Sequence, residues 1–267
     1  CEKEVNELIY RSKFSNENTD LIIWPETTPY YAIDFKNKNK EININDLEHS
    51  HYWNKYIPIS NQSLLSGCEI KQNGKFYNSS ILLDSNGELE YYHKQQLVPL
   101  VEFFPFANKI SFINAAFSKG KNDKIYTVKD INFIGLVCFE STFPEINRRP
   151  INSDKGVDAI IYVVNDGWYE SEPEPSQHAR QTIFRAIENR RPVLRCANRG
   201  ISMYINERGE VEEELELNTK GEINNIKIYE KNNKTFYTRF GNVFAFSLLI
   251  INIGLFISTF IRNEKNK

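Results

Sequence analysis

INFIGLVCFE, residues Ile131–Glu140, is the stretch on which the expected fold depends. Its run of apolar side chains is typical of a buried strand. Ser-Thr-Phe-Pro follows it, and Ser141 or Thr142 is expected to cap the start of a helix. Cys138 would then lie between the strand and the helix, where backbone N–H groups favour negative charge on its sulfur. On this stretch alone, a small buried core cysteine stays an open alternative.

The composition fits one large α/β domain. The chain has 267 residues, of which 40% are hydrophobic and 25% charged, enough to bury a sizeable core. A net charge of −2, with no basic stripe carrying interleaved aromatics, argues against a nucleic-acid partner. The four cysteines have neither CxxC nor Cys/His spacing, which argues against a zinc site. The sequence contains no metal or nucleotide motif, so no cofactor is expected.

The sequence VFAFSLLIINIGLFISTFI, residues Val243–Ile261, is an uncharged run of 19 residues near the C-terminal end. At ~1.5 Å per residue it would extend about 28 Å as a helix, close to the ~30 Å thickness of a bilayer core. This length and composition predict a membrane-spanning helix over residues 240–262 rather than a buried core helix. Basic residues flank the run on both sides, so charge alone does not predict its orientation.

Strand and helix patterns alternate along the rest of the chain. Asn73-Gly74, between the apolar segments Ser63–Ile70 and Lys75–Asp84, predicts a β-hairpin. The alternation predicts an α/β fold with inserted hairpins. The other predicted elements are strands over Leu21–Trp24, Glu88–His93, Asp158–Val164, Val193–Ala197, Ile201–Asn206 and Val211–Leu217, and a helix over Gln177–Arg190.

Three chemically active side chains follow predicted strands: Glu26, Lys94 and Cys138. Separately, each has an ordinary structural explanation: a helix-capping carboxylate, a solvated strand end and a core thiol. Together they suit acyl transfer through a thioester, because a thiol is a nucleophile, a carboxylate accepts protons and a lysine stabilises an oxyanion. A cysteine–histidine pair is the usual alternative. No histidine has a sequence context that favours it as the base, and proximity in space stays open for His49, His51, His93 and His178.

The chain resembles the nitrilase, or carbon–nitrogen hydrolase, superfamily, and within it the apolipoprotein N-acyltransferase branch. The resemblance implies an α/β fold, a nitrilase-like four-layer α-β-β-α sandwich over residues 1–232, followed by one C-terminal transmembrane helix. The segments that carry the resemblance are IIWPET (Ile22–Thr27), YHKQQLVPLVEFFPF (Tyr92–Phe106), GLVCFE (Gly135–Glu140), NDGWY (Asn165–Tyr169) and QH…RAIENRRPVLRCANRGIS (Gln177–Ser202).

By matching position, the resemblance implies that Glu26 is the general base, Lys94 the oxyanion lysine and Cys138 the nucleophile. Glu102 and Glu140 match two further acidic residues that support this group. The chain departs from the common pattern before Glu102, where Val replaces Gly, and at Ala197–Gly200, which replaces Asn-Asn-Gly. Neither departure removes a catalytic group.

Four aromatic residues are expected to bind substrate: Trp24, Phe139, Phe103 and Phe104. Phe139 stands where the family often has Tyr, so a hydroxyl is absent there. The segment Leu97–Phe106, which contains Phe103 and Phe104, is expected either to form an entry for acyl chains or to pack as an ordinary buried loop. Asn165–Tyr169 is expected to be a buried turn that frames the site.

The resemblance further implies the reaction: a fatty acyl chain passes from a phospholipid, through a cysteine thioester, to the N-terminal amine of a diacylglyceryl-cysteine lipoprotein. The expected location is the bacterial inner membrane, with the catalytic domain on its periplasmic side. Members of this branch carry membrane helices and a first strand before the matched segments, so this chain is expected to be a C-terminal part. The alternative is a membrane-tethered amidase or nitrilase acting on a small C–N substrate.

Overall fold

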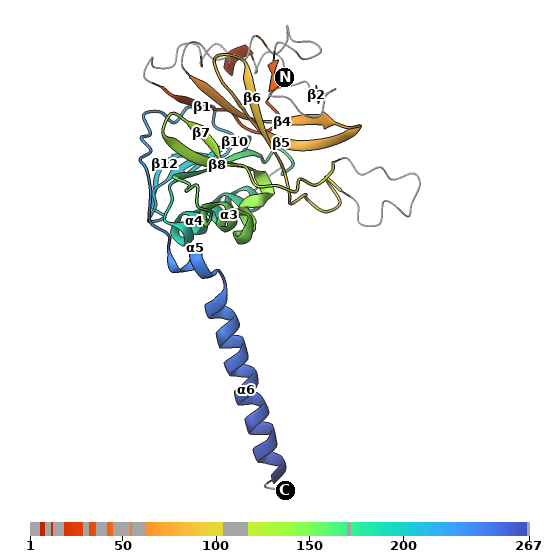
Figure 1. The fold of residues 1–267 in the computed structure, drawn as a ribbon, viewed down its shortest axis with the longest axis vertical. Coiled ribbons are helices and arrows are strands. Elements are labelled where there is room, and N and C mark those ends of the chain that lie inside the picture. Colours follow the sequence, from red (N-terminus) through yellow and green to blue (C-terminus); the bar gives the residue numbers. More distant parts are fainter. Residues whose placement is uncertain are drawn as a thin grey trace.

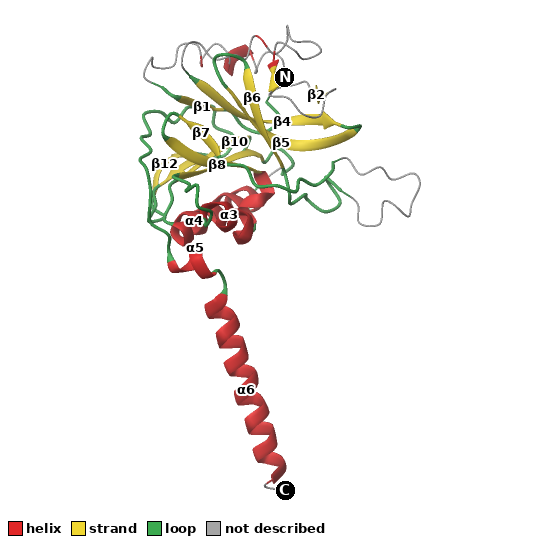
Figure 2. Ribbon diagram, in the orientation of Figure 1, coloured by secondary structure: helices red, strands yellow, loops and turns green. Residues whose placement is uncertain are grey.

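The computed structural model describes residues 6–8, 12, 19–28, 32–35, 42–44, 54, 62–103, 117–169 and 172–265. In these residues, two mixed β-sheets lie face to face (Figure 1). Two helices, α3 (Pro144–Ile151) and α4 (Glu174–Asn189), cover the outer face of the second sheet (Figure 2). The arrangement agrees with the predicted α/β class.

The first sheet has the strand order β1-β4-β5-β6-β3, with β2 also paired to β4. Strands β1 and β2 run parallel to β4, whereas β5 is antiparallel to both β4 and β6. The strands are β1 (Leu21–Ile23), β2 (Ile33–Phe35), β3 (Ile42–Asn43), β4 (Ser63–Gln72), β5 (Lys75–Leu83) and β6 (Glu88–His93).

The second sheet has the order β12-β11-β10-β9-β8-β7. Its centre, β8 to β10, is parallel, and antiparallel strands complete both edges. Strands β8 and β9 are almost wholly buried, as continuous apolar runs in a parallel sheet should be. The strands are β7 (Tyr126–Val128), β8 (Ile131–Val137), β9 (Ala159–Asn165), β10 (Val193–Asn198), β11 (Ser202–Ile205) and β12 (Val211–Leu215).

Two apolar clusters hold the layers together. The larger one fills the space between the sheets and beneath the helices, and includes Leu65, Leu82, Phe133 and Ile161. The smaller one lies on the other face of the first sheet, where helical Leu8 packs against it. Because strand side chains alternate between faces, Leu82 belongs to the first cluster and its neighbours in β5 to the second. The predicted four-layer sandwich would add a helical layer over this second cluster. The structure describes few residues of that layer.

The predicted hairpin is confirmed. Residue Gln72 of β4 pairs with Lys75 of β5 across a two-residue turn. Both turn residues have positive φ, 53° at Asn73 and 74° at Gly74, which is the geometry that an Asn-Gly sequence favours. The predicted strands over Glu88–His93, Asp158–Val164 and Val193–Ala197 are also present, within one residue at each end.

The expected helix cap after Cys138 is wrong in detail. A short 3-10 helix, η4 (Cys138–Thr142), begins at the cysteine itself, and α3 follows it with Pro144 in its first turn. Neither predicted residue caps a helix. The Ser141 hydroxyl contacts His178, and the Thr142 hydroxyl donates to the Phe139 carbonyl at 2.8 Å. The 3-10 helix contains residues Cys138–Thr142, so Ser141 and Thr142 lie inside it and are not at the start of an α-helix.

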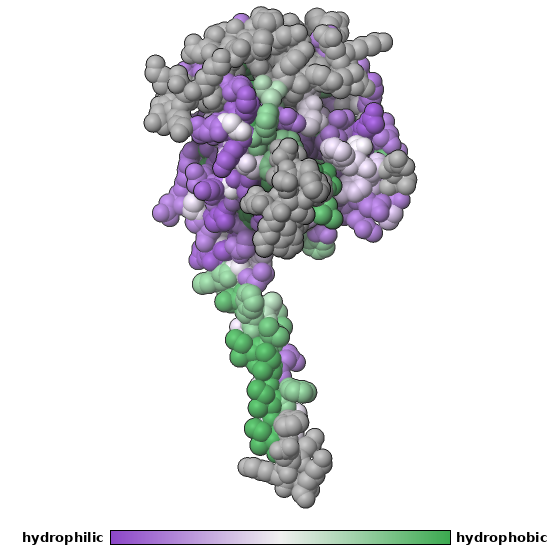
Figure 3. Space-filling view, turned by 90° about the vertical axis from the view of Figure 1, so that its right-hand side faces the viewer, coloured by the Kyte–Doolittle hydropathy of each residue, from purple (hydrophilic) through white to green (hydrophobic). Residues whose placement is uncertain are grey.

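The chain ends in two helices, the short α5 (Phe236–Phe240) and α6 (Val243–Lys265), which extends away from the sandwich (Figure 1). Large apolar side chains along α6 are exposed, among them Phe244 and Ile250 (Figure 3). Within the described residues, no helix reaches the length and apolarity required to cross a membrane. The membrane span over residues 240–262 stays a prediction.

Gly67 positions the segment that carries Glu26. A Cβ atom added to Gly67 would lie 2.6 Å from the Cα of Glu26, and the Gly67 amide also donates to the Pro25 carbonyl. We expect Gly67→Ala to reduce the free energy of unfolding by about 1–3 kcal/mol through overpacking, and to reduce activity by displacing Glu26. Urea unfolding measures the first effect and ester turnover the second.

Gly254→Ala is the matched control, because its added Cβ meets no atom within 4 Å. This control is expected to unfold at nearly the wild-type urea concentration. If Gly67→Ala kept both wild-type stability and wild-type activity, the close approach of β4 to Glu26 would not constrain the site.

Candidate active site

Three segments deliver Glu26, Lys94 and Cys138 to one place. Glu26 lies in the turn after β1, Lys94 directly follows β6, and Cys138 directly follows β8. The Glu26 amide donates to the Val164 carbonyl of β9, which joins the two sheets at this point. The charges of Glu26 and Lys94 both influence the pKa of Cys138. The structure therefore brings the predicted residues together at the junction of the sheets.

Asn78 of β5 joins the two glutamates. Its side-chain nitrogen donates to Glu26 Oε1 at 2.6 Å and to Glu102 Oε1 at 2.7 Å. All three side chains are buried, with 5 to 7% of their surface exposed. A neutral amide thus holds two carboxylates close together without adding charge. The sequence analysis did not identify Asn78. The only indication in the sequence was the presence of an amide side chain in a predicted buried strand.

Lys94 is the cation of the group. It is 1% exposed, and its Nζ donates to Glu102 Oε1 at 2.8 Å. Burial alone would lower the pKa of the Lys94 amine, but the charges of Glu26, Cys138 and Glu102 raise it above its ordinary value. Glu102 is itself anchored by the Val98 amide, which donates to Oε2 at 2.8 Å. Lys94 therefore stays a cation that points into a buried, acidic site.

Glu26 keeps one carboxylate oxygen free. Oε1 accepts the Asn78 hydrogen bond, whereas Oε2 is buried and accepts none from the described residues. Burial raises the pKa of Glu26, and the Lys94 charge and the Asn78 hydrogen bond offset only part of that effect. A buried carboxylate with a raised pKa and an unused oxygen is well suited to accept a proton.

Cys138 adopts an unusual backbone conformation. Its φ is +48°, a left-handed value that a non-glycine residue adopts at a cost and that recurs at active sites. Its Sγ lies 4.0 Å from the Asn165 carbonyl oxygen, at the end of β9. The expected stabilisation of a thiolate by the helix start is wrong: burial and the Glu26 charge raise the pKa of the Cys138 thiol above its ordinary value, although Lys94 lowers it.

Glu140 connects the nucleophile turn to the lysine segment. Its Oε1 accepts from the Tyr92 hydroxyl and the Gln95 amide, both at 2.7 Å, and its Oε2 accepts from the Val137 amide at 3.0 Å. The side chain is fully buried, and burial raises the pKa of Glu140. These bonds clamp the residues beside Lys94 to those beside Cys138, which gives the predicted supporting residue a structural role.

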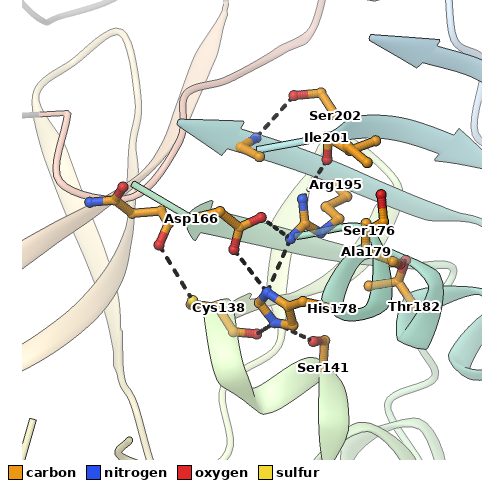
Figure 4. A network of polar contacts seen from close by, with 12 residues as sticks. Cys138, Ser141, Asp166, Ser176, His178, Ala179, Thr182, Arg195, Ile201 and Ser202 are labelled. Carbon is orange, nitrogen blue, oxygen red and sulfur yellow. Dashed lines mark hydrogen bonds and ion pairs between the residues drawn. The ribbon is translucent and has the colours of Figure 1, made fainter. Parts of the chain in front are cut away.

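His178 is a second feature that the sequence did not single out. It lies on α4, and its Nδ1 is 2.9 Å from Asp166 Oδ1 (Figure 4). Its Nε2 is 3.1 Å from Ser141 Oγ and 3.3 Å from the Cys138 carbonyl oxygen. Arg195 donates to Asp166 Oδ2 at 2.7 Å. The alternative that the sequence left open, a histidine near the cysteine, is therefore present, although its contact is with the cysteine backbone.

Cys138, Asp166 and His178 each present one potential metal ligand, and these atoms lie within 4.8 Å of one another. Both Asp166 oxygens, however, already engage His178 and Arg195. A metal ion would have to break the ion pair between Asp166 and Arg195, whose side chains are completely buried. The donor set therefore fits a polar network better than a metal centre.

The predicted substrate-binding residues lie in different surroundings. Trp24 is 4% exposed and packs in the apolar cluster on the outer face of the first sheet. Phe139 packs edge to face against Phe143 beside the nucleophile. Phe103 is partly buried, with Lys119 Nζ 5.1 Å from its ring centre. Phe104 lies outside the described residues. The structure thus places Phe139 next to Cys138, whereas Trp24 belongs to a separate cluster.

The turn after β9 differs from its prediction. Asp166 is buried as expected, but Trp168 is 74% and Tyr169 45% exposed. In the segment after β6, Leu100 and Val101, which precede Glu102, are also exposed. The sequence analysis expected Asn165–Tyr169 to be a buried turn that frames the site. The structure instead places exposed apolar side chains on segments that carry site residues.

Replacing Asn78 tests the coupling of the two glutamates. We expect Asn78→Ala to leave Glu26 and Glu102 without a shared donor and to reduce turnover of an activated ester by about 10- to 100-fold. Asn78→Asp should reduce ester turnover further than Asn78→Ala does, because it adds a third buried carboxylate. Gln62→Ala, at a buried amide directly before β4, serves as a control for loss of stability. Equal activity in Asn78→Ala and wild type would show that the bridge is dispensable.

The raised pKa of Glu26 predicts the acid side of the pH profile. Glu26 accepts a proton only when ionised, so kcat/KM should fall as pH decreases through its raised pKa, with a midpoint above the ordinary value of 4.5. Stopped-flow acylation by a p-nitrophenyl ester measures this limb. Glu26→Gln should abolish the limb and slow acylation by about 10²-fold or more. A midpoint at or below 4.5 would contradict the burial effect.

Comparisons with known proteins agree with this geometry. The family model described as carbon-nitrogen hydrolase matches residues 6–229. The apolipoprotein N-acyltransferase of Rickettsia prowazekii is 31% identical over 252 residues, which cover 90% of this chain and 48% of that protein. That of Geobacter metallireducens is 30% identical over 241 residues, 86% of this chain and 44% of that protein. The chain thus spans about half the length of these curated relatives.

A solved structure supports the fold independently. A variant of the amidase from Nesterenkonia sp. AN1, described with acrylamide added at its active-site cysteine, superposes with a TM-score of 0.58. The match covers 80% of this chain and 84% of that chain at 15% identity, so it bears on the fold alone. With the family model matching most of the sequence and the two-sheet fold in agreement, the chain belongs to the carbon-nitrogen hydrolase family.

Proposed function

We propose that this protein is an N-acyltransferase that moves a fatty acyl chain from a phospholipid to the N-terminal amine of a diacylglyceryl-cysteine lipoprotein. The observation that carries the proposal is a partly buried Cys138 within the influence of the buried Lys94 and of two bridged, buried glutamates. The names of the curated relatives from Rickettsia and Geobacter favour this reaction within the family.

The first half of the proposed reaction forms a thioester. Cys138 Sγ attacks the ester carbonyl carbon while Glu26 takes the thiol proton on its unused Oε2. Lys94 stabilises the resulting oxyanion because it is a buried cation already held in place by Glu102. When the tetrahedral intermediate collapses, the ester C–O bond breaks, and the lysophospholipid leaves with the proton from Glu26.

The second half transfers the acyl group. The α-amine of the lipoprotein cysteine attacks the thioester carbonyl, and Lys94 again holds the oxyanion. Glu26 accepts a proton from the attacking amine, the C–S bond breaks, and the proton returns to the sulfur. The cycle therefore ends with the Cys138 thiol and the starting protonation of Glu26. Both half-reactions use one buried base and one buried cation, which explains why no metal or cofactor is needed in this scheme.

We further propose that the lipid substrates explain the apolar parts of the chain. Exposed apolar side chains on α6 are costly in water and favour a lipid environment, as in the predicted span over residues 240–262. The proposed location is the bacterial inner membrane, with the catalytic domain, residues 1–232, on the periplasmic side. Exposed Leu100, Val101 and Trp168, together with Phe103 and Phe104, would form the entry for acyl chains.

Hydrolysis of a small amide is the second candidate function, because the Nesterenkonia amidase has a similar fold. Hydrolysis of a small amide would use the same Glu26, Lys94 and Cys138, with water replacing the lipoprotein amine and ammonia released. The two functions differ in the second acceptor and in the size of the donor. An experiment that follows both products separates them.

We predict that the purified protein, mixed with phosphatidylethanolamine vesicles and a diacylglyceryl-cysteine lipopeptide, adds one fatty acyl group to the peptide amine. Intact mass spectrometry should also show an acyl group on the enzyme that hydroxylamine removes. Cys138→Ser should lose both the labile adduct and the transfer. Cys68→Ser, a change at a fully buried cysteine of the first sheet, is the matched control and should retain both signals.

Ammonia release from simple amides without any acyl adduct would favour the amidase instead. Transfer activity that survived in Cys138→Ser would contradict the thioester mechanism.

A further inference from the structure

A second buried polar network lies against Cys138, on the side of the second sheet that faces the helices. Arg195 of β10, Asp166 after β9 and His178 of α4 form a chain of contacts that ends at the Cys138 carbonyl oxygen (Figure 4). The Asp166 and Arg195 side chains are completely buried, and that of His178 is 9% exposed. The proposed reaction scheme does not use any of these three residues.

The network fixes the position of the imidazole tightly. Asp166 contacts His178 through one oxygen and Arg195 through the other. Burial alone would raise the pKa of Asp166, but the His178 hydrogen bond and the Arg195 charge lower it below its ordinary value. Arg195 is itself bound to the Ile201 carbonyl. An ionised Asp166 held by a buried arginine leaves His178 little freedom to rotate.

The far side of the imidazole faces the nucleophile turn. His178 Nε2 lies between Ser141 Oγ at 3.1 Å and the Cys138 carbonyl oxygen at 3.3 Å. A carbonyl oxygen can only accept, so the second contact is a hydrogen bond only when Nε2 carries a hydrogen. That holds in the imidazolium, which also donates Nδ1–H to Asp166, and in the neutral tautomer whose Nδ1 accepts from Arg195 Nη2 at 3.2 Å. The bond would then restrain the peptide between Cys138 and Phe139, directly after the residue with a φ of +48°.

The orientation of that peptide has a chemical consequence. In a planar trans peptide, the C=O and the following N–H point in opposite directions. Because the Cys138 carbonyl contacts His178 of α4, the Phe139 N–H points away from α4. Phe139 is the second residue of η4, and the first N–H groups of a helix have no acceptor within that helix. The Phe139 N–H is therefore available to donate to an oxyanion that also contacts Lys94.

We propose that His178, held by Asp166 and Arg195, is a positioning residue that orients the Cys138–Phe139 peptide for oxyanion binding. The inference rests on the proposed thioester chemistry and assigns His178 no role in proton transfer. A left-handed residue at Cys138 is strained, and the hydrogen bond to its carbonyl supplies a restraint that the local sequence does not. His178 acts on the peptide through the Cys138 carbonyl oxygen rather than through the thiol.

The test compares two reactions of Cys138 in two variants. Iodoacetamide alkylation needs only the thiol, whereas acylation by a p-nitrophenyl ester also needs the oxyanion donors. His178→Asn retains an amide near the Nδ1 position but none near Nε2. His178→Gln places an amide nitrogen near the Nε2 position and so retains a donor for the Cys138 carbonyl. Arg180→Gln, on the exposed side of α4, is the control.

We expect His178→Asn to slow acylation by about 10²-fold, similar to the loss of one oxyanion donor. Alkylation should stay within about 3-fold of wild type, and His178→Gln should recover most of the acylation rate. Equal acylation in His178→Asn and wild type would overturn the inference. So would a parallel loss of alkylation and acylation, or equal defects in the Asn and Gln variants, because a merely structural role predicts those results.

A further variant covers the case in which His178→Asn does not fold. A Cβ on Gly200 would overlap the Asp166 carboxylate, so Gly200→Ala should displace Asp166 without changing any ionisable group. It should slow acylation more than alkylation, and equal slowing would again overturn the inference. Failure of the proposed function gives a different result. Wild type would then be acylated by the ester but would never pass the acyl group to the lipopeptide, whichever residue stands at position 178.

Discussion

The active site depends on the burial of one cation among several acids. Lys94 is almost completely buried, and its Nζ bonds to a glutamate that also shares an amide with a second glutamate. Removing a charge from water costs several kcal/mol, so such a group persists only when opposite charges and hydrogen bonds surround it. The Glu102 carboxylate and the Asn78 amide provide that environment. Burial, to which the charge of a neighbouring carboxylate adds, explains why Glu26 and Cys138 both hold their protons more firmly than usual.

The two sheets contribute different parts of the chemistry. The first sheet supplies the base, the lysine and the bridging amide, through β1, β6 and β5. The second sheet, with α4 beside it, supplies the nucleophile and the network of Arg195, Asp166 and His178. Glu140 connects them, because one carboxylate accepts hydrogen bonds from the segments beside Lys94 and Cys138. A relative shift of the sheets would therefore separate base from nucleophile, which makes the sandwich core part of the catalytic apparatus.

The sequence predicted the elements whose signals are local. The Asn-Gly turn, the apolar run of β8 and the periodic helix α4 all appear where expected. Glu26, Lys94 and Cys138 were identifiable because each follows a strand and matches a family motif. Asn78 and His178 were missed, since their importance arises from contacts 52 and 40 residues away along the chain. Such contacts depend on the packing of sheets and helices, which no local pattern encodes.

The surroundings of two predicted site residues differ from what the sequence indicated. Cys138 was expected at a capped helix start that lowers its pKa, but the turn is a 3-10 helix and burial raises the pKa instead. Trp24, which was expected to bind substrate, packs in the cluster on the far face of the first sheet, and its role stays a prediction. Trp24 lies on the same face of the first sheet as Ile22, two residues before it, as alternation along an extended segment requires.

The central claim is that Cys138 is a neutral thiol in the resting enzyme and loses its proton to Glu26 during attack. The pH dependence of iodoacetamide alkylation tests it most directly, in wild type and Glu26→Gln. The account predicts that the rate keeps rising beyond pH 9, the ordinary value for a thiol, with no plateau near neutrality. It predicts that the alkylation rate of Glu26→Gln rises at lower pH than that of wild type, because the substitution removes a negative charge near the thiol. A plateau near pH 7 in wild type would reveal a preformed thiolate and contradict the account.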